Sequence, residues 1–191
     1  MPVTADILAT YRGPARVLAD KLARGVQDPV ALVYLAAGAI LGFVAQLPRL
    51  RREALLPNPE FERAILAERG EVRQIEAVGV PQDLVAAKFE ALVSGALFAW
   101  VFVMPLLFYL IAALSAFVMR RLGGRPSGLA ARLALFWSFL AASPLLLLQG
   151  LGAGLIGPGP AVTGLSVLWL AVFLWFWIAS MREAGWGGVP G

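Results

Sequence analysis

Five glutamates in one polar segment are the densest group of metal-ligand candidates in the chain: Glu60, Glu62, Glu68, Glu71 and Glu76. Glu68 and Glu71 lie three residues apart, which would place both carboxylates on one face of a helix. Carboxylate oxygens are ligands for divalent cations. Three arginines are interleaved with them: Arg63, Arg69 and Arg73. Alternating charges are typical of a solvated helix face that pairs with itself. We favour that interpretation and predict no metal site.

Cysteine and histidine, the residues most used in catalysis and metal binding, are both absent from the chain. Their absence rules out a thiolate nucleophile, a Ser-His-Asp triad, a Cys/His zinc site and a histidine haem ligand. It also rules out disulfide bonds. We find no nucleophile–base pair and no phosphate-binding glycine loop. We therefore expect no catalytic residue and no cofactor, and we expect that the protein is not an enzyme.

The composition places the chain among membrane proteins. Of its 191 residues, 60% are hydrophobic and only 15% are charged, whereas soluble domains carry about 25% charged residues. The net charge is +4, and the basic residues cluster beside apolar runs. That pattern is explained by the positive-inside rule, so nucleic acid is not an expected partner. The length suits a single membrane domain over residues 1–191.

The element that organises the chain is an uncharged stretch from Leu133 to Met181. As one helix it would be more than twice as long as a ~30 Å hydrocarbon core requires. Its middle, residues 150–160, is rich in glycine and proline, which disfavours a continuous helix. We predict two spans, residues 129–151 and 160–181, joined by a tight uncharged turn. Pro144 is a candidate kink in the first of these spans.

Two further uncharged runs, residues 29–48 and 91–119, complete a set of four predicted spans. The second run is longer than the bilayer core, and Pro105 is its natural kink. The first contains the motif Gly38-Ala-Ile-Leu-Gly42, which with Ala45 forms a narrow stripe for close helix packing. The stripe suits a dimer face, but we favour contact with other spans of the same chain.

The segments outside the spans also carry helix signals. In residues 1–28 a helix is expected to begin at Pro14, with Val17 and Leu18 on an apolar face and Lys21 on the polar face, lying in the membrane interface. In the polar segment 49–90, Asn58 is the expected N-cap of a helix. A second start near Pro81 is predicted to continue into the span 91–119. The tail 182–191 is expected to be unstructured.

Two groups of residues are candidates for contacts with lipid. The basic loop, residues 120–128, contains Arg120, Arg121, Gly123, Gly124 and Arg125. These residues suit a lipid head group, although we favour an ordinary positive-inside loop. The second group is aromatic: Trp169, Phe173, Trp175 and Trp177. A ligand box is one interpretation of this group, and lipid-facing interfacial aromatics are the favoured one.

These features predict an all-α integral membrane protein with about four spans, an amphipathic N-terminal interfacial helix and a helical polar loop after the first span. Four spans place both termini on one side. That side collects nine basic residues, whereas the opposite side has seven basic and eight acidic residues. The positive-inside rule then predicts cytoplasmic termini. The composition suits the cytoplasmic membrane of a bacterium.

Three motifs in the membrane domain resemble the bacterial branch of the Yip family, multi-span proteins named for their interaction with Ypt/Rab GTPases. They are Met119-Arg-Arg-Leu-Gly-Gly-Arg-Pro-Ser127, then Ser143-Pro144 followed by four leucines, then Ser180-Met-Arg-Glu-Ala184. The resemblance extends from about Pro14 to Ala184. It implies a small helical membrane domain without catalysis, linked to membrane organisation or assembly with other membrane proteins.

Four functions follow, in decreasing order of preference. The first is a non-enzymatic membrane adaptor or organiser of the Yip type, which acts through helix–helix and lipid contacts. The second is an accessory subunit of a larger membrane complex. The third is a small transporter or channel, which usually needs an intramembrane ionisable residue, and the uncharged runs that define the spans contain none. The fourth is an enzyme acting on lipid. The expected partners are membrane lipids and other membrane proteins or a second copy of the chain.

Overall fold

The computed structural model describes residues 3–70 and 81–187, and every regular element in them is helical. Two short helices come first, α1 (Val3–Thr10) and α2 (Pro14–Ala23). The other elements follow in this order: α3 (Asp28–Leu55), α4 (Pro59–Glu68), α5 (Gln82–Phe98), the π-helical turn η1 (Ala99–Val103), α6 (Met104–Arg121), α7 (Gly128–Leu155) and α8 (Pro160–Trp186).

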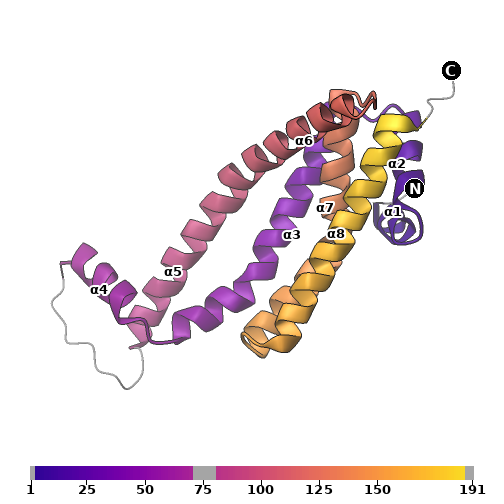
Figure 1. The fold of residues 1–191 in the computed structure, drawn as a ribbon. Helices are drawn as coiled ribbons and strands as arrows, with labels where there is room; N and C mark the ends of the chain where they lie inside the picture. Colours follow the sequence, from indigo (N-terminus) through magenta and orange to yellow (C-terminus); the bar gives the residue numbers. More distant parts are fainter. Residues whose placement is uncertain (1–2, 71–80, 188–191) are drawn as a thin grey trace.

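Four helical stretches are long and apolar enough to cross a membrane: α3, the continuous stretch α5–η1–α6 (Gln82–Arg121), α7 and α8. The protein is therefore an all-α membrane protein with four spans, as the sequence predicts. Figure 1 shows the N-terminal helices, the α6–α7 connection and the end of α8 at one end of the bundle, and α4 and the α7–α8 turn at the other.

The helices extend beyond the uncharged runs that predicted them. α3 does not end at Pro48 but continues to Leu55, with Pro48 inside it. Proline there removes a single backbone hydrogen bond, and the arginines that follow are good helix formers. Arg49 also pairs with Glu53 one turn later, at 3.6 Å. Charge marks where a helix leaves the membrane, not where the helix ends.

The turn between α7 and α8 is shorter than the predicted 150–160. α7 continues to Leu155, so residues 150–155 are helical and the connection is reduced to residues 156–159. Gly157 has a φ of +86°, a backbone conformation that suits glycine. The predicted tail is also too long, because α8 continues to Trp186; residues 188–191 lie outside the described part of the chain.

The prediction that a helix starting near Pro81 continues into the second span is confirmed. α5 starts at Gln82, directly after Pro81, and continues without a break into α6. Pro105 is accommodated by a wider turn just before it. The Met104 N–H donates to the carbonyl of Ala99, five residues back, and residues 99–103 are π-helical. Such π turns are a known response to an interrupted helical ladder.

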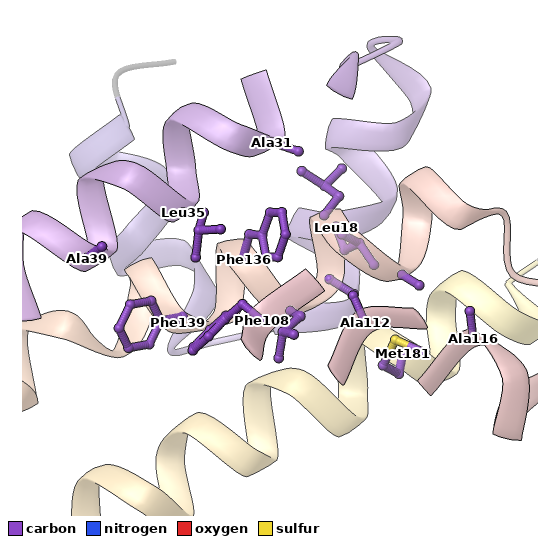
Figure 2. Packing of buried hydrophobic residues seen from close by; sticks show 14 of the residues in the cluster. Leu18, Ala31, Leu35, Ala39, Phe108, Ala112, Ala116, Phe136, Phe139 and Met181 are labelled. Atoms are coloured by element: carbon purple, nitrogen blue, oxygen red, sulfur yellow. The ribbon is translucent and has the colours of Figure 1, made fainter. Parts of the chain in front are cut away.

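α7 is the central helix of the bundle. In its most apolar stretch 67% of the residues are buried inside the protein, against 33% in α3, 17% in α5–η1–α6 and 11% in α8. Every residue from Leu133 to Ser143 is buried. Figure 2 shows how α2, α3, α6, α7 and α8 all contribute to the same apolar core; its labelled residues are Leu18, Ala31, Leu35, Ala39, Phe108, Ala112, Ala116, Phe136, Phe139 and Met181.

Phe139 of α7 lies at the centre of the aromatic contacts in this core. Its ring centroid lies 4.7 Å from that of Phe108 in α6, 6.2 Å from that of Phe173 in α8 and 6.2 Å from that of Trp100 in η1. One side chain thus contacts three other helical segments. Offset and edge-on ring contacts of this kind stabilise a core beyond their buried area, by about 0.5–1.5 kcal/mol per pair.

The N-terminal segment forms two helices packed on the bundle, not one helix lying free in the interface. Pro14 is the first residue of α2, as predicted, and Val17 and Leu18 are buried. The prediction for Lys21 was wrong: this side chain is 3% exposed and lies inside the contact between the two short helices and α7. Lys21 is buried because an acidic partner, Asp6, is buried beside it.

Candidate interaction surface

The predicted packing stripe on α3 contacts other spans of the same chain. A Cβ at Gly38 would collide with the ring of Phe139 in α7, and a Cβ at Gly42 would collide with the ring of Trp100 in η1. Ala45 is buried against α7. The stripe is therefore filled within the protein, which is the alternative that we favoured over a dimer face.

Two glycines in α7 are equally important, and sequence reasoning assigned them to a turn. A Cβ at Gly150 would collide with the backbone carbonyl of Ala45, and a Cβ at Gly154 would collide with Pro48. Gly150 and Gly154 form a second small-residue motif with the same four-residue spacing. That four-residue spacing was the sequence signal that could have identified these glycines as helix-packing residues. Together these glycines let α3 and α7 approach backbone to backbone.

The α8 aromatics form a ladder along the helix, and most of it faces inward. The rings of Trp169 and Phe173 stack at 5.7 Å, and those of Phe173 and Trp177 at 6.1 Å. These three residues are partly buried against the core, so they are not simply lipid-facing. The indole N–H groups of Trp169 and Trp177 are buried without an acceptor among the described residues. Trp175 is 49% exposed and points outward.

The basic loop is fastened to the end of α8. The Arg125 N–H donates to the carbonyl of Gly185 at 2.9 Å, and the Gly124 N–H donates to the carbonyl of Met119 at 2.9 Å. Gly123 has a φ of +86° and ends α6. Arg120, Arg121 and Arg125 are all exposed, and the guanidinium of Arg121 lies 5.0 Å from the ring of Phe117. The loop therefore presents three exposed cations at this end of the bundle.

A groove of about 600 Å³ runs between α6 and α8. Its walls are apolar apart from Ser115 and Arg182, and the Ser115 hydroxyl is already bonded to the carbonyl of Ile111 within its own helix. The residues that line it are Ile111, Leu114, Ser115, Val118, Met119, Leu122, Trp177, Ile178, Met181, Arg182 and Trp186. The bond between Arg125 and Gly185 joins the α6–α7 loop to α8 near its end.

An ion pair joins the two N-terminal helices to each other, and Trp137 of α7 holds this pair of helices to the bundle. The Lys21 Nζ donates to the Asp6 carboxylate at 2.8 Å. It also lies 3.6 Å from the centre of the Trp137 ring in α7. The Trp137 indole N–H donates to the Thr10 hydroxyl at 3.0 Å, and that hydroxyl donates to the Asp6 carbonyl at 2.7 Å. The polar groups of these four side chains are thus bonded to one another. The contact has a structural role, because it holds α1, α2 and α7 together.

A second buried ion pair fastens α4 to α5. Sequence reasoning placed Glu62 on a solvated face, but its side chain is 1% exposed and accepts from Lys88 Nζ at 2.7 Å. Burial raises the pKa of Glu62, but the hydrogen bond from the Asn58 N–H and the bond and charge of Lys88 outweigh it, so the pKa is lowered from its ordinary value. Asn58 is the N-cap of α4, as predicted, and accepts from the Phe61 N–H.

The hydroxyls of Ser115, Ser138 and Ser166 each donate to a backbone carbonyl four residues earlier in their own helix.

The acidic side chains of the described residues are not arranged as a metal site. No three of them come close enough to share a cation within residues 3–70 and 81–187; Glu71 and Glu76 lie outside those residues.

Comparison of the chain with protein-family models, with curated proteins and with solved structures found no match in any of the three. Candidate partner surfaces are therefore defined by geometry alone: the α6–α8 groove and the exposed faces of α8 and of α5–η1–α6.

Proposed function

We propose that the protein is a non-enzymatic membrane adaptor or organiser, of the kind that the resemblance to the Yip family implies. The observation that carries the proposal is the uneven burial of the four spans. α7 and α3 are the more buried spans, whereas the apolar windows of α5–η1–α6 and α8 are only 17% and 11% buried and both stretches border an open apolar groove. A partner helix or a lipid chain would fill that groove.

The polar groups support an adaptor over a carrier or an enzyme. Lys21 and Lys88 are each bonded to a buried carboxylate of the same chain. Arg132 is bonded to Asp28 at 2.6 Å, which ties the start of α7 to the start of α3. These charges hold helices together at the membrane surfaces. Contacts between apolar helix faces are what the rest of the surface offers.

The proposed location is the cytoplasmic membrane of a bacterium, with both termini in the cytoplasm. The end of the bundle that carries α1, α2 and the α6–α7 loop (Figure 1) also carries nine of the sixteen basic residues and four of the twelve acidic ones. Positive charge near span ends favours the cytoplasmic side. An accessory subunit of a larger complex would use the same groove and differ only in having a permanent partner.

Because the chain has no cysteine, a single introduced cysteine is a clean cross-linking probe. We would place it in the groove with Leu114→Cys. The matched control is Val33→Cys, an exposed apolar position on α3 at the same end of the bundle; the two residues are 54% and 62% exposed. The variants are treated in native membranes with a maleimide that carries a photo-reactive benzophenone group and are then illuminated. Each cross-linked product is identified after purification.

An adaptor is expected to give a specific cross-linked product with another membrane protein from the Leu114→Cys variant and none from the Val33→Cys variant. A product of fixed stoichiometry that also survives detergent purification would indicate the accessory subunit. The proposal would be rejected if neither variant cross-links and the purified chain alone carries a solute flux in liposomes.

A further inference from the structure

A second opening, of about 340 Å³, lies at the opposite end of the bundle from the groove mouth, where α3 meets the α7–α8 turn. Arg49, Arg52 and Glu53 of α3 line it, together with Gln149 of α7 and Val162 of α8. Arg49 directly follows the uncharged run that ends at Pro48. The opening therefore lies at the level where α3 leaves the hydrocarbon core, the level of the lipid head groups.

Arg52 is the unusual residue in this opening. Its Nε is buried and has no acceptor among the described residues. Its guanidinium packs on Gly157 so closely that a Cβ there would collide with it. The nearest carboxylate along the helix, that of Glu53, pairs with Arg49 at 3.6 Å. A partly buried guanidinium without a counter-charge is costly, because it has lost water without gaining a partner.

The surroundings of Arg52 favour a negative ligand. The Gln149 side chain adds an amide donor to the opening. Val162, in the first turn of α8, also lines the opening, so the positive dipole end of α8 adds to the arginine charge. A guanidinium presents a planar pair of donors that matches the oxygens of a phosphate group. Arg52, Gln149 and the first turn of α8 thus line one opening.

We infer that this opening binds a phosphate group, held by the guanidinium of Arg52 with the amide of Gln149 as a second donor. Two sources share this chemistry: the phosphodiester of a membrane phospholipid, and free inorganic phosphate. The site is separate from the α6–α8 groove and does not depend on the adaptor function. It would also tie the end of α3 to the α7–α8 turn through the bound anion.

The test is ligand-dependent thermal unfolding of the full chain, purified in a maltoside detergent until phospholipid-free and followed by tryptophan fluorescence. Three probes are added separately: inorganic phosphate, phosphatidylglycerol in mixed micelles, and diacylglycerol as the lipid without phosphate. The variants are R52Q and the control R63Q, which removes an exposed arginine of α4 at the same end of the bundle. R63Q is expected to respond as the wild type does.

We expect a phosphate-bearing probe to raise the unfolding midpoint of the wild type, diacylglycerol to have no effect, and R52Q to weaken the response at least tenfold in ligand concentration. Stabilisation by phosphatidylglycerol alone would identify the lipid as the source, and stabilisation by phosphate alone would identify the free anion. If R52Q does not fold, Gln149→Leu should weaken binding about fivefold. The inference is wrong if no phosphate probe stabilises the wild type, or if the folded variants respond as the wild type does.

Discussion

Among single residues, two buried lysines connect the peripheral helices to their neighbours. Lys21 and Lys88 are 3% and 1% exposed, and each ends at a carboxylate from a neighbouring helix. A buried pair of this kind adds little over a well-packed apolar pair, but removing one partner leaves the other charge buried and alone. The two pairs therefore specify which helices meet, and each is sensitive to loss of one member.

Lys88→Met is expected to release α4 from α5. The substitution keeps the side-chain volume but leaves the Glu62 carboxylate buried without its cation and the Leu56 carbonyl without its donor. The cost is about 3–5 kcal/mol, confined to the α4 contact. Hydrogen exchange of the α4 amides measures it. The double variant Lys88→Met with Glu62→Leu should recover most of the protection; if it does not, the pair is not the cause.

Acid should open the same contact. The pKa of Glu62 is lowered from its ordinary 4.5 in the folded protein. The pair therefore contributes its full stability above about pH 4.5, and this contribution is lost as the pH falls through the lower folded value. Protease cleavage within α4 should rise in that acidic range. The Gln side chain of Glu62→Gln cannot ionise, so cleavage of this variant should no longer depend on pH in that range. If the variant shows the same pH dependence as the wild type, Glu62 is not the group responsible.

Gly150→Ala is expected to be strongly destabilising although alanine is the better helix former. The new methyl group would collide with the carbonyl of Ala45, a backbone atom that cannot rotate away. Overpacking of this kind costs about 1–3 kcal/mol. The matched control is Gly164→Ala in α8, where nothing lies within 4 Å of the new Cβ and helix propensity predicts a gain of up to about 1 kcal/mol. The measurement is the thermal unfolding midpoint of each variant in detergent, compared with that of the wild type.

At the scale of the helices, the sequence predicted where the four spans lie, but not which helices pack against one another. Long uncharged runs revealed four spans, because burying charge in lipid is costly wherever it occurs in the sequence. The ends were misplaced because helices such as α3 continue into water, where charge no longer opposes them. The partners of Lys21 and Glu62 lie 15 and 26 residues away, and periodicity reports which face a residue occupies, not what covers that face.

Lys21→Met should detach the two N-terminal helices from α7. It removes the cation from both the Asp6 carboxylate and the Trp137 ring, an expected loss of about 1.5–3 kcal/mol. A reporter cysteine at Val17, which is 7% exposed, should then be labelled faster by a soluble maleimide. Arg24→Met, at an exposed position of the same segment, is the control and should leave the labelling rate unchanged.

At the scale of the whole molecule, the order of burial could not be predicted from composition. α7 and α8 are similarly apolar, yet the apolar window of one is mostly buried and that of the other mostly exposed. The difference lies in small residues: the glycines at 150 and 154 let α3 approach α7 closely. Such spacing was noted on α3 but missed in α7, because those glycines were assigned to a turn. The Arg52 opening lies where α3, α7 and α8 meet, and the candidate groove lies between α6 and α8; neither had a sequence signal.

The topology provides a test of the whole arrangement. The variants Arg125→Cys, in the α6–α7 loop, and Gly159→Cys, in the α7–α8 turn, place single cysteines at opposite ends of the bundle (Figure 1). In intact cells a membrane-impermeant maleimide should label the Gly159→Cys variant only, and in lysed cells it should label both variants. Labelling of the Arg125→Cys variant alone in intact cells would reverse the proposed orientation, and labelling of both there would contradict four spans.

The short turn between α7 and α8 has a consequence for biosynthesis. Residues 156–159 contain no charged side chain, so the two helices can enter the bilayer together as a hairpin without carrying charge across it. The central helix of the bundle therefore reaches the membrane late, after α3 and α6 are already there. Until then, the part of α3 at Ala45 and Pro48, which packs on Gly150 and Gly154, lacks its α7 partner. We expect a nascent chain halted before residue 128 to be a preferred substrate of membrane quality-control proteases.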